Sequence, residues 1–303
     1  MIELAPEVHD AINSGEAVVA LETTLVAHGF PAGEGLAVAL EAERRVREAG
    51  AVPATVGVLD GRLRVGLSAG ELERFAAAGD SARKAGPRDL AVCVAERVLG
   101  ATTVGGTLAA CSVAGIRFLG TGGIGGVHRG FAERPDVSAD LGELARAAVL
   151  VVSSGIKSLL DVAATLEVLE ALGVPVLGWQ TETLPLFYTA EGGPPVRAAV
   201  ATASEAAAVA RAHWSLDRAG LLLTRPPVES LDVEPLIEAA LMKTRSGDVT
   251  GPDVTPFVLA EIHRETAGES VRIFTLLIAV NAALAAEVAV AYTAAESDGR
   301  RRP

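Results

Sequence analysis

The sequence predicts an α/β fold in three layers, α/β/α, with a mixed, largely parallel sheet and a helical C-terminal third. Short apolar runs alternate with helical patterns over the first two thirds of the chain, as in a sheet that helices cover on both faces. Half of the 303 residues are hydrophobic and only 4% are aromatic, which suits closely packed helices and buried strands and excludes a disordered chain. From Val233 onward the pattern is essentially helical.

The strands are predicted from short apolar runs bounded by turn residues. Two of these runs flank Asp60-Gly61, a dipeptide typical of a tight turn, so we expect them to pair as a hairpin. In order along the chain, the expected strands are Ala17–Leu21, Ala54–Leu59, Leu63–Val65, Ile116–Leu119, Val149–Ser153, Val174–Gly178 and Leu221–Thr224.

The helices are predicted from a period near 3.6 residues and from residues that favour helix N-termini. Ser68, with Glu71 three residues later, has the pattern of a capping box. Pro87 suits the first turn of a helix, and Ser138 suits an N-cap. In order, the expected helices are Gly33–Ala49, one beginning at Ser68, one opening at Pro87, Ser138–Ala147, Ser158–Leu172 and Ala203–His213.

The chain is expected to form a single domain over residues 1–295. No repeat of fixed period and no long linker divides it. The stretch Thr189–Val196, with two Gly and two Pro, is expected to be a loop or flap. The polar residues 296–303 are expected to be a disordered tail.

The charge balance argues against a protein that binds macromolecular anions. The chain has 26 Lys and Arg against 38 Asp and Glu, a net charge of −12. We therefore expect neither a nucleic acid nor an anionic membrane as a partner. A small anionic substrate would have to be met by a local cluster of basic residues.

The cysteines and the long apolar run indicate a cytoplasmic protein. Cys93 and Cys111 are too few for a disulfide scaffold and suit the core of a protein in a reducing compartment. The N-terminus lacks the pattern of a signal peptide. The run Ile273–Tyr292 contains Asn281 and Glu287 and is rich in Ala, so we expect a buried core helix and not a membrane span.

Polar residues follow several predicted strands at their carboxyl ends, where ligands gather in open α/β sheets. Glu22 follows the first strand, and the glycine-rich loop Gly120–Gly130, with His128 and Arg129, follows another. Lys157 comes after the strand that ends at Ser153. We expect the acid, the loop and the lysine to meet in one crevice.

Lys157 and Glu22 each allow a chemical and a structural interpretation. Lys157 follows a buried strand and precedes an apolar helix, which would desolvate its ammonium and favour an amine that attacks a carbonyl-like carbon. The alternative is a surface lysine that caps a loop. Glu22 is either a buried general acid with a raised pKa or an N-cap for the residues that follow.

The glycine loop allows three interpretations. Gly120, Gly122 and Gly125 fit G-x-G-x-x-G, which suggests a dinucleotide-binding oxidoreductase, but the polar segment Val127–Asp136 shows no helical period after it. The loop could instead hold a single phosphate on its backbone amides, helped by neighbouring basic residues that include Lys84. It could also be a tight structural loop.

Two aspartates, Asp136 and Asp140, lie on either side of Ser138. Ligands that are all oxygen favour Mg²⁺ or Mn²⁺ over zinc, and the sequence has no His/Cys spacing typical of a zinc site. Both residues could equally be favourable charges at a helix N-terminus.

Long motifs follow one another along the chain: ALETTLVAHGFP (20–31), GAVPATVGVLDGRLRVGLS (50–68), KAGPRDL (84–90), GTGGIGGVHRG (120–130), DVSADL (136–141), SGIKSLLD (154–161) and VPVLGWQT (174–181). They closely resemble the pseudouridine-5′-phosphate glycosidase family, from residue 5 to residue 294. The resemblance implies an enzyme that cleaves the C–C glycosidic bond of pseudouridine 5′-phosphate reversibly, through ring opening and a lysine–C1′ imine. It also implies one Mn²⁺ per subunit and a homotrimer of α/β/α subunits.

Residue by residue, the resemblance implies that Lys157 is the nucleophile, that Glu22 is the proton donor and that Asp136 binds the metal. The implied substrate contacts are Lys84, Val104, Thr121, His128, Ser138, Ala139, Asp140 and Asn281.

The C-terminal helix departs from the family pattern. The family often has Asn at Phe274 and an Asn pair at Val280-Asn281, so substrate preference could differ. A sugar-phosphate-binding homologue without activity is therefore one alternative function. The dinucleotide-binding oxidoreductase is the other.

Overall fold

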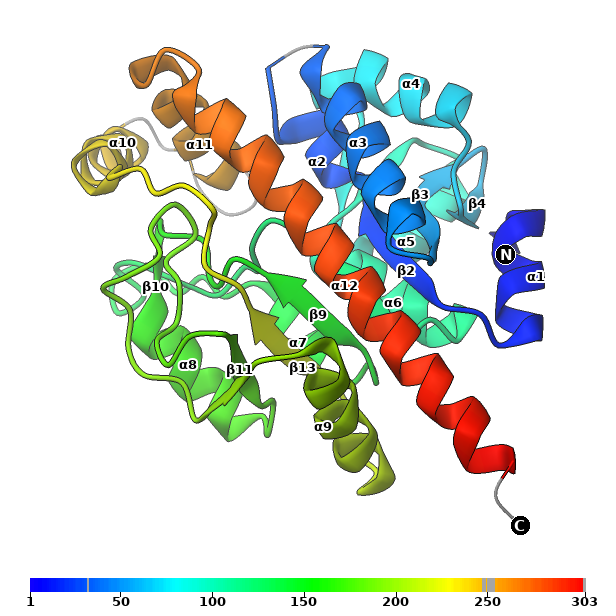
Figure 1. Cartoon of the computed structure of the whole chain (residues 1–303). Coiled ribbons are helices and arrows are strands. Elements are labelled where there is room, and N and C mark those ends of the chain that lie inside the picture. The colour runs from blue at the N-terminus through cyan, green and yellow to red at the C-terminus, as the bar shows by residue number, and fades with distance from the viewer. Residues whose placement is uncertain (32, 247–248, 250–253, 302–303) are drawn as a thin grey trace.

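The computed structural model describes residues 1–303 except 32, 247–248, 250–253 and 302–303. It has the three-layer α/β/α architecture that the sequence predicts (Figure 1). The helices are α1 Pro6–Ser14, α2 Thr24–His28, α3 Glu34–Glu48, α4 Ala69–Ala78, α5 Leu90–Glu96, α6 Val104–Ala114, α7 Ala139–Leu144, α8 Val162–Ala171, α9 Ala203–Ser215, α10 Glu234–Ser246, α11 Val254–Glu265 and α12 Glu269–Arg301.

Within the described residues, the strands form an eleven-stranded sheet and a two-stranded one. The main path of the large sheet is β1-β4-β3-β2-β7-β9-β13-β11-β12, mostly parallel, and β6 joins β3 to β5. The strands are β1 Ile2–Leu4, β2 Val18–Glu22, β3 Val52–Leu59, β4 Arg62–Val65, β5 Arg83–Ala85, β6 Gly100–Thr102, β7 Phe118–Gly120, β9 Leu150–Ser153, β11 Val176–Trp179, β12 Ala198–Val200 and β13 Leu221–Thr224, with β8 Val127–His128 and β10 Leu160–Asp161 in the small sheet.

Two local signals in the sequence are confirmed. Strands β3 and β4 pair antiparallel across Asp60 and Gly61, whose φ angles of 53° and 78° are both positive, as a two-residue hairpin turn of this kind requires. The Ser68 hydroxyl accepts a hydrogen bond from the Glu71 amide, and the Glu71 carboxylate accepts one from the Ser68 backbone N–H, which completes the capping box.

The long helix α12 is the centre of one helical layer. In Figure 1 it crosses the molecule diagonally, and it packs on β2, β7 and β9 between α3 and α9. By length and hydropathy α12 could cross a membrane, but 67% of its apolar window is buried inside the protein. This burial is typical of a core helix, as the sequence predicts.

Other features follow from the packing of the core. Cys93 and Cys111 are free and fully buried, as small core residues are.

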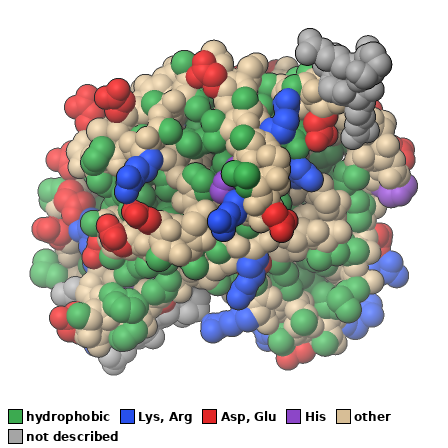
Figure 2. Space-filling view, turned by 90° about the horizontal axis from the view of Figure 1, so that it is seen from below, with side chains coloured by type: hydrophobic (Ala, Val, Ile, Leu, Met, Phe, Trp, Pro, Cys, Tyr) green, Lys and Arg blue, Asp and Glu red, His purple; other side chains and the backbone are tan. Residues whose placement is uncertain are grey.

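On the face shown in Figure 2, acidic, basic and hydrophobic side chains are interspersed, as on a solvent-facing surface.

Three helix boundaries differ from the sequence prediction. The helix expected from Ser158 begins only at Val162, because Leu160 and Asp161 first pair with β8 as strand β10, and Asp161 then caps the helix. The segment at Pro87 is a 3₁₀ turn that precedes α5. Helix α7 ends at Leu144, earlier than expected.

The C-terminal region is helical, as predicted. Helix α12 continues to Arg301, so most of the expected tail is helical where it is described. Residues 302–303 and parts of the connection between α10 and α11 lie outside the described residues.

Candidate active site

A pocket of about 1360 Å³ opens beside the carboxyl ends of the central strands. It brings together most of the residues that the sequence predicts for the site. Those that line it are Glu22, Lys84, Val104, His128, Asp136, Ser138, Ala139, Asp140 and Lys157. Thr121 and Asn281 do not line it and are buried behind it.

Glu22 is the last residue of β2 and is only 5% exposed. Burial raises the pKa of its carboxyl, although the charge of Lys157 and the hydrogen bond from Thr121 act in the opposite direction. The Thr121 hydroxyl donates that hydrogen bond to Glu22 Oε1 at 2.5 Å. Glu22 is therefore a buried acid and not a helix cap, and it retains its proton to a higher pH than an exposed glutamate.

Lys157 lies on a turn that follows β9. Its backbone N–H donates to the carbonyl of Ile124, which joins this turn to the glycine-rich loop. The lysine lines the same pocket as Glu22, and its charge acts on the pKa of that carboxyl. The structure thus places the predicted nucleophile and the predicted acid in one cavity.

Asp140 joins two parts of the pocket wall. Its Oδ1 accepts a hydrogen bond from the Gly105 amide in the first turn of α6, at 2.7 Å. Its Oδ2 accepts one from the Gly125 amide in the glycine-rich loop, at 2.8 Å. Asp140 is 4% exposed, and its two carboxylate oxygens join α6 to the glycine-rich loop.

We expect Asp140→Asn to destabilise the protein. An amide group presents one oxygen instead of two, so either Gly105 or Gly125 would lose its acceptor, at a cost of about 1–3 kcal/mol. Urea unfolding measures this change. Asp10→Asn is the control, because the Asp10 side chain is 82% exposed. Equal free energies of unfolding for the two variants would contradict the assignment.

Asn281 supports the site from behind. Its side-chain amide on α12 donates to the Thr121 carbonyl at 2.9 Å and to the Ser154 hydroxyl at 3.1 Å. Thr121 follows β7 and Ser154 follows β9, so Asn281 fixes two strand ends at once. The substrate contacts predicted for Thr121 and Asn281 therefore stay predictions. In the structure, both residues make hydrogen bonds within the protein.

His128 and Asp136 face each other in the pocket. His128 Nε2 lies 3.8 Å from Asp136 Oδ2. Burial lowers the pKa of the His128 imidazole, the charges of Lys84 and Lys157 lower it further, and Asp136 opposes them. His128 therefore tends toward the neutral form, which can accept a hydrogen bond.

The donors present suit a weakly held, hard cation and no closed metal cage. Among the residues that the structure describes, no three His, Cys, Asp or Glu side chains are grouped so that they could hold a metal. Asp136 is about one-third exposed in the pocket, and Asp140 has both oxygens occupied. Mn²⁺ or Mg²⁺ bound by one carboxylate, with water and substrate oxygens, fits this arrangement.

The glycine-rich loop is built for close packing. A Cβ on Gly125 would lie 2.3 Å from Ser138 Oγ, and one on Gly122 would lie 2.5 Å from the Phe274 ring. Five amides of the loop already donate to protein acceptors, those of Thr121, Ile124, Gly125, Val127 and His128.

The dinucleotide motif lacks its structural context. Strand β8 follows the glycines where the motif requires the start of a helix. The oxidoreductase interpretation therefore has no structural support. The five amides that donate within the protein are not available to a phosphate.

Sequence reasoning missed two contacts to the turn of Lys157. Arg129 donates to the carbonyls of Ser158 and Leu160, and it pairs with Glu234 of α10. The segment Leu184–Tyr188 covers the same turn. In the sequence, the adjacent aromatic residues Phe187 and Tyr188 are the feature of this segment that could have indicated a buried contact.

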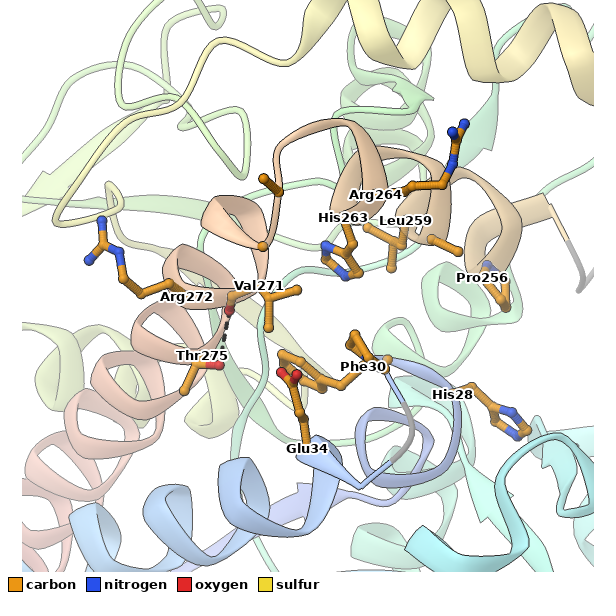
Figure 3. Close-up of a pocket in the computed structure, with 15 residues that line it drawn as sticks. His28, Phe30, Glu34, Pro256, Leu259, His263, Arg264, Val271, Arg272 and Thr275 are labelled. Carbon is orange, nitrogen blue, oxygen red and sulfur yellow. Dashed lines mark hydrogen bonds between the residues drawn. The ribbon is translucent and has the colours of Figure 1, made fainter.

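A second pocket, of about 890 Å³, adjoins the first. His28, Gly29, Pro256 and Leu259 line both. In Figure 3, Phe30 and His263 lie on facing sides of the second pocket, with ring centroids 6.4 Å apart. Neither predicted catalytic residue lines it, so the reactive groups belong to the larger pocket.

The departure at Phe274 changes the character of the wall between the pockets. The Phe274 ring lines the larger pocket and stacks on Phe30, with centroids 4.8 Å apart, and it also contacts Phe187. This part of the wall is therefore apolar at a position where the resemblance implies an amide.

Comparisons with known proteins identify the family of the chain. The family model described as "Indigoidine synthase A like protein" matches residues 7–291. The pseudouridine-5′-phosphate glycosidase of Chloroflexus aurantiacus is 48% identical, over 96% of this chain and 98% of its own length. That of Herpetosiphon aurantiacus is 47% identical, over 95% of this chain and 97% of its own length.

Two solved structures are similar over nearly the whole chain. The prealnumycin C-glycosynthase AlnA, in complex with ribulose 5-phosphate, is 36% identical and has a TM-score of 0.88, over 98% of this chain and 99% of its own. An indigoidine synthase A-like protein from Thermotoga maritima is 35% identical, with a TM-score of 0.87 and coverage of 97% of each chain. The chain therefore belongs to the indigoidine synthase A-like family of enzymes, and its curated relatives include pseudouridine-5′-phosphate glycosidases.

Proposed function

We propose that the protein reversibly cleaves the C–C glycosidic bond of pseudouridine 5′-phosphate, giving uracil and ribose 5-phosphate. Its relatives are glycosidases named for pseudouridine 5′-phosphate, and one similar solved structure is a C-glycosynthase in complex with ribulose 5-phosphate. Both names indicate chemistry at a C-glycosidic bond of a sugar phosphate. The observation that carries the proposal is the pairing of a buried carboxyl, Glu22, with the amine of Lys157 in one pocket.

A C-glycoside needs chemistry that an N-glycosidase does not supply, because uracil would leave as a carbanion. In the proposed sequence, Glu22 protonates the ribose ring oxygen as the C1′–O bond breaks and uracil loses a ring proton. C1′ is then conjugated with the base, and the Lys157 amine adds to it. Protonation of uracil C5 with cleavage of the C–C bond leaves an imine on Lys157. Water hydrolyses this imine to ribose 5-phosphate.

The polar residues of the larger pocket are proposed to bind the ribose phosphate. Lys84 supplies the positive charge, and the neutral His128 ring supplies an N–H that can donate to a phosphate oxygen. The two side chains line the same pocket, and the charge of Lys84 lowers the pKa of His128. Ser138, Ala139 and Val104 line the same wall. These groups would hold a small anion in spite of the negative net charge.

Asp136 is proposed to hold Mn²⁺. A divalent ion there would offset negative charge on substrate oxygens. By membership of the family we also propose that the protein is a cytoplasmic homotrimer.

We expect Asp136→Ala to lose most of the stimulation by Mn²⁺ and to keep its fold, because the Asp136 side chain is only partly buried. The experiment measures uracil release from pseudouridine 5′-phosphate with added Mn²⁺ and after chelation. The wild type should release uracil faster with Mn²⁺, while the variant should respond weakly. A variant that responds to Mn²⁺ as the wild type does would contradict the metal assignment.

The same assay tests the function as a whole. Tight binding of ribose 5-phosphate without uracil release would favour the inactive sugar-phosphate-binding homologue. Uracil release at rates far above the uncatalysed reaction supports the enzyme.

A further inference from the structure

Phe187 has a backbone conformation that bulky residues rarely adopt. Its φ angle is +64°, in the left-handed region, and its side chain is 1% exposed. Such a conformation persists only where surrounding contacts impose it, and it is found preferentially at functional sites. The contacts of Phe187 and its neighbours all lead to the turn that carries Lys157.

The backbone around Phe187 holds both ends of this turn. The Phe187 N–H donates to the Ser154 carbonyl at 2.9 Å, and the Ser158 hydroxyl donates to the Leu186 carbonyl at 2.7 Å. Between them, a Cβ on Gly155 would lie 2.0 Å from the Pro185 carbonyl oxygen, so the two segments touch at their backbones. The turn of Lys157 is thus clamped on each side of the lysine.

The Phe187 ring occupies the space next to the lysine stem. A Cβ on Gly123 would lie 2.6 Å from the ring and 3.4 Å from Lys157 Cγ. The ring and the stem therefore meet at the bare backbone of Gly123. The ring is held in turn by Tyr188 and Phe274, with centroids 4.8 Å and 5.2 Å away.

We propose that Phe187 is a positioning residue for Lys157: its ring and its backbone hydrogen bond fix the direction of the lysine side chain and keep its stem in apolar surroundings. This inference rests on the proposed role of Lys157 as the nucleophile. Because Phe187 does not line the larger pocket, it acts on the reaction through the lysine.

The test compares Phe187→Leu with Phe118→Leu. Phe118 is a matched control because it is also buried, at 3% exposure, also packs edge-on against aromatic rings, and lies at the start of β7, away from the site. Each variant is incubated with ribose 5-phosphate and borohydride, and the rate of covalent sugar phosphate attachment at Lys157 is followed by mass spectrometry. The sequence has three lysines, Lys84, Lys157 and Lys243, which fall on different peptides, so peptide mapping assigns the attachment site.

We expect Phe187→Leu to lower the trapping rate and kcat together, by about 10- to 100-fold, as a misplaced reacting group does. KM should change little, because the sugar phosphate contacts remain. Phe118→Leu should lose stability but keep the trapping rate of the wild type. If Phe187→Leu does not fold, Phe187→Met serves in its place, with the same expected result.

The outcomes separate this inference from the proposed function. No attachment to Lys157 in the wild type would overturn the nucleophile and with it the inference. Attachment in the wild type, with an equal rate in Phe187→Leu, would overturn the positioning role alone. An equal loss in Phe118→Leu would show a general effect of destabilisation and would also overturn it.

Discussion

Lys157→Ala is expected to reduce uracil release from pseudouridine 5′-phosphate to the uncatalysed rate. The proposed reaction passes through a covalent bond to the Lys157 amine, and no acid or base can replace that bond. General acid–base catalysis contributes typically about 10²–10⁴-fold, so Glu22 alone could not restore the turnover. A continuous assay of uracil measures the loss, and binding of ribose 5-phosphate shows whether the pocket is intact.

Lys243→Ala is the matched control. Lys243 lies on α10, half exposed, and pairs with Glu261 on α11, outside the larger pocket. It should release uracil at the rate of the wild type. Substantial activity in Lys157→Ala would exclude the lysine–C1′ imine and leave a mechanism that depends on Glu22 alone.

Glu22→Gln is expected to lower kcat by about 10²–10⁴-fold, the range of a lost general acid. Burial raises the pKa of the Glu22 carboxyl, so the acid remains protonated at a pH where an exposed glutamate is ionised. Activity that needs the protonated form should fall as the pH rises through this raised pKa. The control is Glu43→Gln, because Glu43 is a partly buried carboxyl whose pKa burial also raises, and it lies on α3 outside the larger pocket.

We also expect Glu22→Gln to change how the free energy of unfolding depends on pH. The unfolded chain ionises Glu22 near the ordinary pKa of 4.5, whereas the folded chain keeps the proton to a higher pH. The folded state therefore binds more protons in this window, and its free energy of unfolding falls as the pH rises from 4.5 through the raised pKa. Glu22→Gln should lack this fall. Urea unfolding across the window measures the difference, and identical pH profiles would contradict a buried, protonated Glu22.

Local signals in the sequence predicted local structure well. The Asp60-Gly61 turn and the Ser68 capping box depend on neighbouring residues only, and both are present. The start of α8 was predicted four residues early, because Leu160 and Asp161 pair with a strand far away in the sequence. The three-residue strands β1, β5, β6 and β12 were missed, since so short a run has no period to detect.

The site was predictable in part, because two of its residues directly follow strands that the sequence indicates. Glu22 and Lys157 follow buried strands, and the carboxyl ends of neighbouring parallel strands meet at one edge of the sheet, so their convergence could be expected. Asp140 was predicted to contact substrate or metal, but its role in holding Gly105 and Gly125 depends on the packing of α7 against α6. The left-handed backbone of Phe187 arises from tertiary contacts alone, and no pattern in the sequence indicates it.

The support that Asn281 gives to the strand ends has a consequence for how the protein is made. Asn281 lies on α12, 160 residues after Thr121; its side-chain amide donates to the Thr121 carbonyl, and the Thr121 hydroxyl donates to Glu22. Strand β2, which ends at Glu22, and strand β7, which Thr121 follows, are synthesised long before α12. A growing chain therefore contains Glu22 and Lys157 before it contains the helix whose Asn281 fixes the strand ends beside them. We expect the site to reach its final arrangement only after α12 has been synthesised.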